Sequence, residues 1–580
     1  MTRCLRPLLM LAAIGSIGIG VGADDAPAPE LIRLMADELQ YSMKELVNDD
    51  AMRPYYLAYT ITDTASESIV TQLGAVYRDD TNRQRMLDVD LRVGDYQLDN
   101  THKIRGGRMR GFGLRVPGGG ARVSLDDNPD AIRHALWRAT DREFTFAVAQ
   151  YQQVLTNQQT MVEENAAADF SRERPTVAFE PDATVTIDHA AWAERLRAVS
   201  AMALSYPQIH ASQVALSATT ENRFMVTSEG TRLKTGRTLL RVAVSASTKA
   251  DDGMDLEQMY IFSTASVAGL PSEAEMREAF QGVIDQALAL RDAPLVEPYT
   301  GPAILMNRAS GVFFHEIFGH RIEGHRQKDV DEGQTFTHMV GKPILPDFIS
   351  VTDDPTLARL GDEDLRGFYA YDDEGVPAQR VELVKSGMLR TFLLSRSPVG
   401  TFTTSNGHGR REPGNEVVSR QGNLMVESSR AVTFARLREM LVEECRAQDK
   451  PYGFLFEDIT GGFTTTSRGG PQAFKVLPVV VYRVYADGRP DELVRGVDIV
   501  GTPLSCFEQI ICTGDDLAVF NGTCGAESGW VPVSAISPSI LVRQIEIEKR
   551  QRSQERLPIL DPPIAGRSSV RLGPVTREEE

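Results

Sequence analysis

Two histidines and a glutamate occur within six residues of one apolar stretch, and this segment constrains the fold more than any other. It runs from Phe313 to His320 and places Glu316 directly after His315. On a regular helix, residues five apart lie about 140° apart around the axis, so the two imidazoles would point in different directions. They can face one ion only if the helix departs from regular form. We expect a widened turn near Gly319, the residue most able to allow it.

This residue pattern indicates metal chemistry. Two imidazoles beside a carboxylate are the minimum needed for a metal that activates water next to a general base. The chain has only 9 histidines in 580 residues, which favours a shared role for His315 and His320 over two buried histidines that only hydrogen-bond to neighbours. We therefore predict a zinc site with these two ligands and with Glu316 as the base.

A zinc ion needs at least one further ligand, and the nearby candidates are Glu323 and His325. His325 follows a glycine that is expected to end the helix, which counts against it. Cys524 is a distant candidate, because glycines close on both sides let the backbone approach and a thiolate is a strong zinc ligand. The alternative for this thiol is a disulfide to Cys506 or Cys512.

The amino terminus has the parts of a secretory signal. Arg3 and Arg6 precede an apolar stretch from Leu8 to Val21, and small residues follow up to Ala23. The stretch is too short to cross a bilayer comfortably. We therefore expect cleavage after Ala23, a periplasmic or secreted protein, and no stable membrane span.

Charge and motif content exclude two function classes. The chain has 62 basic and 80 acidic residues, a formal net charge of −18, and the acidic residues are spread along it. We therefore expect no nucleic-acid partner, since such binding needs clustered Lys and Arg. No Gly-x-Ser-x-Gly segment is present, so the sequence gives no support for a serine hydrolase.

Hydrophobic periodicity predicts an α+β chain with two domains. The amino-terminal domain, residues 24–296, mixes helices with antiparallel strands, and prolines at 294, 298 and 302 mark its end. The carboxy-terminal domain, residues 297–548, is β-rich with Gly-rich turns and carries the metal-site helix. A signal peptide at 1–23 and an extended or disordered tail at 549–580 complete the chain.

More detailed expectations concern the amino-terminal domain. Apolar residues at helical spacing predict helices over 29–47, 129–159, 190–205 and 272–291. An antiparallel meander is expected from three short strands at 56–62, 68–77 and 86–93, in which the Asp-Asp-Thr-Asn run at 79–82 forms a turn. Further strands are expected between 212 and 264.

Three blocks of the carboxy-terminal half resemble the TldD/PmbA family of metalloproteases. The first runs from Gly301 to Gly324 and contains both histidines, the second from Asp372 to Arg380, and the third from Gly522 to Ile540. Their order and spacing are those of the family, whereas the amino-terminal half resembles it only in overall pattern. The better-known members are cytoplasmic, so the signal sequence is a departure from the family.

The resemblance implies a zinc endopeptidase that cleaves short or unfolded peptides. Carried over by motif, His315, His320 and Cys524 bind zinc and Glu316 is the base. The family has an active subunit that keeps His-Glu-x-x-x-His, as this chain does, and a partner that has lost it. The resemblance therefore implies a homodimer, or a heterodimer with a related subunit. Ligation of Cys524 would leave at most one disulfide among the other cysteines of the mature chain, Cys445, Cys506 and Cys512.

Several alternatives stay open at this point. Polar residues that are candidates for stabilising an oxyanion are Tyr369, Tyr371, His408 and Arg410. The acidic run 372–374 is either a second metal cluster or, as is more common before Gly-x-Pro, a turn. The alternative function is a non-catalytic, zinc-stabilised scaffold or binding subunit of a protease-like assembly. Glu316 argues against it, because a purely structural site needs no carboxylate beside its ligand.

Overall fold

The computed structural model describes residues 28–48, 51–103, 120–158, 167–329, 332–467, 474–501, 503–550 and 563. The predicted signal peptide, residues 1–23, lies outside these ranges, and so does the predicted tail beyond residue 550 except for residue 563. Within the described ranges, no helix is both long and apolar enough to cross a membrane.

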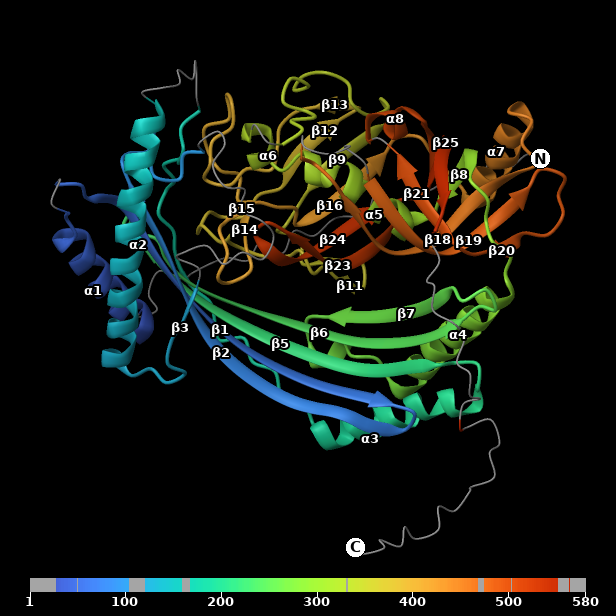
Figure 1. Ribbon diagram of the computed structural model, residues 1–580, viewed down its shortest axis with the longest axis horizontal. Coiled ribbons are helices and arrows are strands. Elements are labelled where there is room, and N and C mark those ends of the chain that lie inside the picture. Colours follow the sequence, from blue (N-terminus) through green and yellow to red (C-terminus); the bar gives the residue numbers. More distant parts are fainter. Residues whose placement is uncertain are drawn as a thin grey trace, which may run out of the picture.

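The amino-terminal half is built on a curved, mostly antiparallel sheet (Figure 1). Its strands are β1 Pro54–Gln72, β2 Ala75–Val93, β3 Ala121–Arg122, β4 Val177–Phe179, β5 Ala211–Thr227, β6 Arg232–Lys249 and β7 Asp255–Thr264. They run side by side in the order β3-β2-β1-β5-β6-β4, and β7 also pairs with β6.

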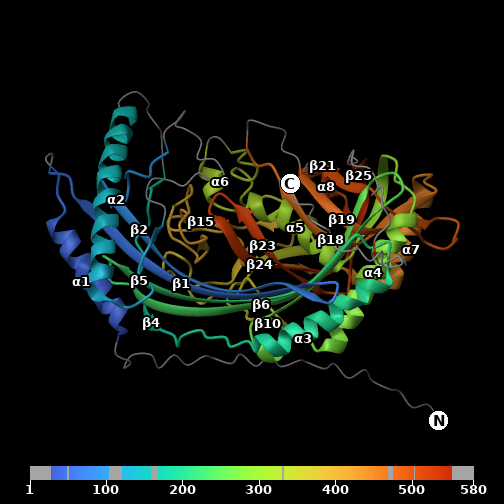
Figure 2. The same cartoon turned by 60° about the horizontal axis from the view of Figure 1, so that its bottom comes forward.

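Helices cover the convex face of this sheet (Figure 2). They are α1 Glu30–Glu45, α2 Pro129–Gln158, α3 His189–Ser200 and α4 Glu273–Asp292, and they agree with the predicted helices. Alternate side chains of each strand face them: Tyr59 and Ile61 of β1 pack in one core with α1 and α2, while Leu240 and Val242 of β6 pack in another with α3 and α4. The other face of the sheet is turned toward the carboxy-terminal half (Figure 1).

The predicted three-strand meander is wrong. The chain instead forms one long hairpin of β1 and β2, whose turn is at Leu73 and Gly74, both with positive φ. Residues 79–82 lie inside β2 and pair with β1, as Ser68 does with Asp80. Their side chains are exposed, so this strand tolerates a polar run that has the composition of a turn.

The carboxy-terminal half contains two larger sheets. The first consists of β9 Ile349–Asp353, β12 Val381–Lys385, β13 Met388–Leu389, β16 Asn423–Ser428, β23 Ala518–Ala526 and β24 Gly529–Ser537. The second consists of β8 Tyr299–Leu305, β17 Ala431–Val432, β18 Tyr452–Thr464, β19 Phe474–Tyr485, β20 Glu492–Val494, β21 Val497–Gly501, β22 Ile510–Gly514 and β25 Ile540–Lys549. Two short ladders, of β10 Arg359–Leu360 with β11 Glu363–Asp364 and of β14 Gly409–Arg410 with β15 Val418–Ser419, lie beside them.

One helix is enclosed by this half. α5 Asn307–Ile317 packs against β18 of the second sheet and against β23 and β24 of the first. The other helices are α6 His325–Lys328, α7 Phe434–Ala447 and α8 Pro503–Glu508. The first and last strands of the half, β8 and β25, pair with each other. The predicted α+β class is confirmed. The junction predicted near residue 297 falls between α4 and β8, and the domain bounds stay a prediction.

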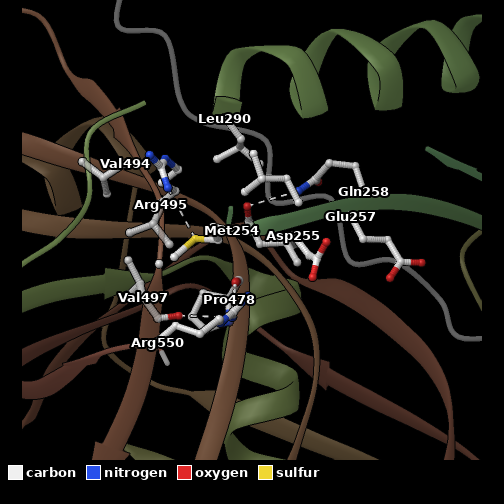
Figure 3. A pocket seen from close by; sticks show the side chains of 14 residues that line it. Met254, Asp255, Glu257, Gln258, Leu290, Pro478, Val494, Arg495, Val497 and Arg550 are labelled. Carbon is white, nitrogen blue, oxygen red and sulfur yellow. Dashed lines mark hydrogen bonds between the residues drawn. The ribbon is translucent and has the colours of Figure 1, made fainter. Parts of the chain in front are cut away.

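Charge pairs join the two halves of the chain. Arg396, 2% exposed, donates two hydrogen bonds to the carboxylate of Glu229, at 2.7 and 2.9 Å, and its guanidinium lies 3.9 Å from the centre of the Phe170 ring. At the other end of the sheet, Arg495 donates to Asp252 at 2.9 and 3.0 Å beside a small cavity that also involves Met254 (Figure 3).

We predict that Arg396→Met lowers the free energy of unfolding by about 3 kcal/mol, because Glu229 then loses its buried cationic partner. Arg436→Ala is the control: Arg436 forms ion pairs with Glu439 and Glu443 on the exposed side of α7, and its loss leaves the free energy of unfolding almost unchanged. Urea-induced unfolding measures both. Equal, small losses would contradict the prediction.

Candidate metal centre

The chain leaves the α-helix between the two histidines. α5 ends at Ile317, and a 3₁₀ turn follows over Gly319–Arg321. The predicted departure near Gly319 is confirmed, but the expected widened turn is wrong, since the turn is tighter than an α-helix. Gly319 is needed for close approach: a Cβ there would lie 1.9 Å from Oε1 of Gln421. Ending the helix frees His320 from the helical spacing that would separate it from His315.

The structure brings His315 and His320 together with Cys524. Their ligand atoms all lie within 4.8 Å of one another. Nε2 of His320 is 3.4 Å from Sγ of Cys524, and the two imidazole rings have centres 5.1 Å apart. Cys524 lies in β23, which is held in a hairpin with β24, and it is a thiol without a disulfide bond. A residue distant in sequence therefore completes the cluster.

Glu316 lies at the edge of this cluster. Its Oε2 atom is 3.9 Å from Nε2 of His320, and the side chain is 7% exposed. Gly462 of β18 packs directly on it, because a Cβ at that position would be 2.8 Å from Cγ of Glu316. Burial raises the pKa of the carboxyl group. The side chain is thus positioned beside the cluster and able to exchange a proton.

The cluster favours a thiolate. Burial raises the pKa of the Cys524 thiol, but the two imidazoles and the guanidinium of Arg420 offset this and hold the pKa well below its usual range. Arg420 also donates a hydrogen bond from Nη2 to the carbonyl oxygen of Cys524, at 2.8 Å. A thiolate is the form in which cysteine binds metals.

Glu323, a candidate ligand from sequence, lies behind His320 instead. Its Oε2 atom is 3.2 Å from Nδ1 of His320 and accepts a hydrogen bond from Nε of Arg326 at 2.8 Å. Its other oxygen is 3.4 Å from Nε of Arg420. The carboxylate is fully buried, and His320 and Arg326 hold its pKa well below its usual range against the effect of burial. Sequence reasoning missed this orienting role, although an acidic residue three positions after a ligand histidine was a signal for it.

His325, the other nearby candidate, is occupied elsewhere. Its Nε2 atom contacts the carboxylate of Glu527, which also accepts a hydrogen bond from Arg326 at 2.8 Å. The sequence placed His325 just after the end of the metal-site helix. In the structure that helix, α5, already ends at Ile317, and His325 is the first residue of α6. His325 thus belongs to an ion-pair network at the side of the centre.

The remaining sequence candidates lie away from the cluster. Asp372 accepts backbone hydrogen bonds from Glu374 and Val376, so the acidic run forms a turn. In the part of the chain that the structure describes, His315, His320 and Cys524 are the only group that could hold a metal. Of the oxyanion candidates, His408 is buried beside Asp353 at 3.3 Å, and the three others line a cleft described below, namely Tyr369, Tyr371 and Arg410.

The donor set fits zinc. Two imidazole nitrogens and one thiolate form a combination that zinc commonly binds, and three protein ligands leave a position for water or substrate. Nδ1 of His315 is buried and has no hydrogen-bond partner among the described residues, so this imidazole is not committed to the surrounding protein. The site thus meets the chemical requirements of a catalytic zinc centre.

Comparisons with known proteins concern mainly this half of the chain. Residues 298–549 match the family model described as PmbA/TldA metallopeptidase C-terminal domain. A metalloprotease of Archaeoglobus fulgidus is 28% identical over 284 residues, which are 47% of this chain and 61% of that protein. A zinc metalloprotease TldD homologue of Saccharolobus solfataricus is 26% identical over 251 residues, 42% of this chain and 51% of that protein. The chain thus spans about half the length of the curated relatives it matches.

The fold resemblance extends over both halves. The crystal structure of TldE from Thermococcus kodakarensis superposes on this chain with a TM-score of 0.57. The match covers 89% of this chain and 100% of that one, at 14% sequence identity. It shows a common fold that includes the amino-terminal half.

We predict that Glu323→Gln lowers zinc affinity about 10-fold to 100-fold, because the neutral amide fixes His320 less firmly. Chelator competition measures the affinity, and thermal unfolding verifies that the variant is folded. Glu382→Gln, on an exposed side chain of β12 that pairs with Lys385, is the matched control and leaves affinity unchanged. An unchanged affinity in folded Glu323→Gln would refute the orienting role.

Proposed function

Since this chain belongs to the TldD/PmbA family, which includes named metalloproteases, we propose that it is a zinc-dependent endopeptidase that cleaves short or unfolded peptides. The observation that carries the proposal is the position of Glu316, buried 3.9 Å from one of two histidines that cluster with a cysteine. His315, His320 and Cys524 would hold the ion, which supplies Lewis acidity toward a water molecule and a peptide carbonyl when bound.

In this proposal the protein's own contribution is proton transfer and positioning. The Glu316 carboxylate accepts a proton from the attacking water and later donates it to the leaving amine. Burial raises the pKa of this carboxyl group, which favours holding the proton until the amine leaves. Glu323 keeps His320 oriented, and Arg420 keeps the Cys524 segment in place through the carbonyl hydrogen bond.

Assembly and location are further parts of the proposal. The resemblance of the sequence to the TldD/PmbA family supports a dimer, either with a second copy or with a related subunit. The basic and apolar leader of the sequence supports export to the periplasm or beyond. Light scattering of the purified protein and sequencing of its amino terminus test these two points.

We predict that Glu316→Gln keeps zinc and lowers peptide cleavage by at least about 100-fold, because only the proton transfer is removed. Cys524→Ala lowers zinc occupancy and abolishes cleavage, because a ligand is lost. Metal analysis and cleavage of a fluorogenic peptide library measure the two properties separately. Full cleavage by Glu316→Gln would refute Glu316 as the base. No cleavage by the unsubstituted zinc-loaded protein would refute the protease proposal and leave a zinc-stabilised scaffold.

His325→Ala is the matched control for the ligand assignment. It removes an imidazole close to the centre that is paired with Glu527, so zinc occupancy is retained. Should His325→Ala lose zinc while Cys524→Ala keeps it, the third ligand would be His325 rather than Cys524.

A further inference from the structure

An arginine-rich cleft lies between the concave face of the amino-terminal sheet and the carboxy-terminal half. Its lining includes Arg223, Arg237 and Arg410, together with the aromatic side chains of Tyr369 and Tyr371. Two further arginines adjoin it: Arg241 and Arg366 are close enough for electrostatic contact with each other, and Arg366 also with Arg237. The cleft together with these five arginines is called the arginine cleft below.

Strand register explains how the sheet contributes its three arginines. On β6, Arg237 and Arg241 lie four residues apart and therefore point to the same face, opposite to Leu240 and Val242 in the helix-covered core. Arg223 lies on the neighbouring strand β5, two residues from the partner of Arg237. Arg366 and Arg410 approach this face from the carboxy-terminal half, where Arg223 also donates to the carbonyl oxygen of Tyr371 at 3.2 Å.

The carboxylates of the cleft are already engaged. Glu221 pairs with Arg237 at 2.9 Å, and Asp373 pairs with Arg223. Glu180 accepts a hydrogen bond from the backbone nitrogen of Gly236 at 3.0 Å. Asp372, the fourth carboxylate of the lining, accepts the backbone hydrogen bonds of its own turn and a further one from Gly409.

Three guanidinium groups therefore have no carboxylate partner. Among the described residues, no carboxylate lies within ion-pair distance of Arg241, Arg366 or Arg410. Arg410 is 3% exposed and donates to the backbone carbonyl of Gln421 at 2.6 Å. The Nε atoms of Arg366 and Arg237 are buried without hydrogen-bond partners among these residues. Arg410 is buried, whereas Arg241 and Arg366 are half-buried. A cation that has lost much of its hydration and has no anion is costly, so such a group indicates a ligand that supplies one.

The electrostatic environment agrees with this geometry. Burial, together with repulsion from Arg241 and Arg237, lowers the pKa of Arg366 to about 10. Burial likewise lowers the pKa of Arg410 to about 10. Both groups stay charged at neutral pH. The five arginines exceed the four carboxylates of the lining by one charge. In a chain with a formal net charge of −18, this local excess of positive charge favours anions.

The arginine cleft is connected to the metal centre. Arg410 donates to the carbonyl oxygen of Gln421, and the side-chain amide of Gln421 donates to the carbonyl oxygen of His315 at 3.4 Å. The same amide packs on Gly319. The cleft and the metal centre are therefore neighbours, separated by the side chain of Gln421 and two hydrogen bonds.

We propose that the arginine cleft binds a carboxylate of the peptide substrate, either its terminal carboxylate or an acidic side chain, away from the bond that is cut. The inference rests on the proposed peptidase function and adds a substrate class to it. Guanidinium groups bind carboxylates through paired, charge-assisted hydrogen bonds, and Nε of Arg366 is available for one. Acidic peptides are then the preferred substrates of an acidic protein.

Equilibrium binding tests this inference without relying on cleavage. The zinc-loaded Glu316→Gln protein is titrated into dye-labelled, alanine-based peptides that carry either glutamate or glutamine, each with a free or an amidated carboxyl terminus. Fluorescence anisotropy measures the dissociation constants. We expect the fully acidic peptide to bind about tenfold more tightly than the neutral one. The amidated and glutamine forms show which carboxylate is bound.

Substitutions in the same background locate the binding. Arg241→Gln and Arg366→Gln each reduce the preference for the acidic peptide from about tenfold to about threefold, because each removes one unpaired guanidinium. They are tested separately so that one misfolded variant does not decide the result. Arg78→Gln is the control: it removes an equal charge from an exposed pair with Asp80 on β2, and the preference is retained.

Two outcomes would overturn the inference. One is equal binding, or no binding, of all four peptides. The other is a preference for the acidic peptide that survives both Arg241→Gln and Arg366→Gln. Failure of the peptidase proposal looks different: the unsubstituted zinc protein would cut none of the peptides, while the charge preference in binding and its loss in the two variants would persist.

Discussion

The metal centre depends on the charge pairing of one fully buried carboxylate, that of Glu323. Glu323 has no access to water, so its charge must be paired within the protein. It is met by His320, Arg326 and Arg420. The two arginines in turn bind the segment around Cys524, through its carbonyl oxygen and through Glu527. One buried charge therefore holds the two chain segments of the cluster at a fixed separation, independently of any ion.

The halves of the molecule contribute different things to function. The carboxy-terminal half contains the whole metal cluster on α5, the 3₁₀ turn and β23. The amino-terminal sheet supplies arginines on its concave face, beside a small apolar cluster, while most of its apolar side chains pack on the helix-covered face. Buried contacts such as that of Arg396 with Glu229 fix the distance between them. The space in which a peptide would lie is thus shaped by both halves.

Local patterns in the sequence predicted what depends on local chemistry. Helical spacing located α1, α2 and α4 within a few residues, and two histidines beside Glu316 identified the candidate site. Features that depend on residues distant in sequence could not be predicted. The polar strand at 79–82 resembles a turn until its pairing with β1 is known. Likewise, no spacing indicates that Arg366 faces Arg241 across two halves of the chain, since only tertiary structure brings them together.

The pairing of β8 with β25 has a consequence for the order in which the centre is made. Cys524 is synthesised 204 residues after His320, and the sheet that carries α5 on one side is complete only when its first strand meets its last. A nascent chain that has produced both histidines still lacks the thiolate and the β23–β24 hairpin on which α5 packs. Two imidazoles alone discriminate poorly among metals. The complete cluster of two imidazoles and a thiolate is therefore available only once the carboxy-terminal half has been synthesised and folded.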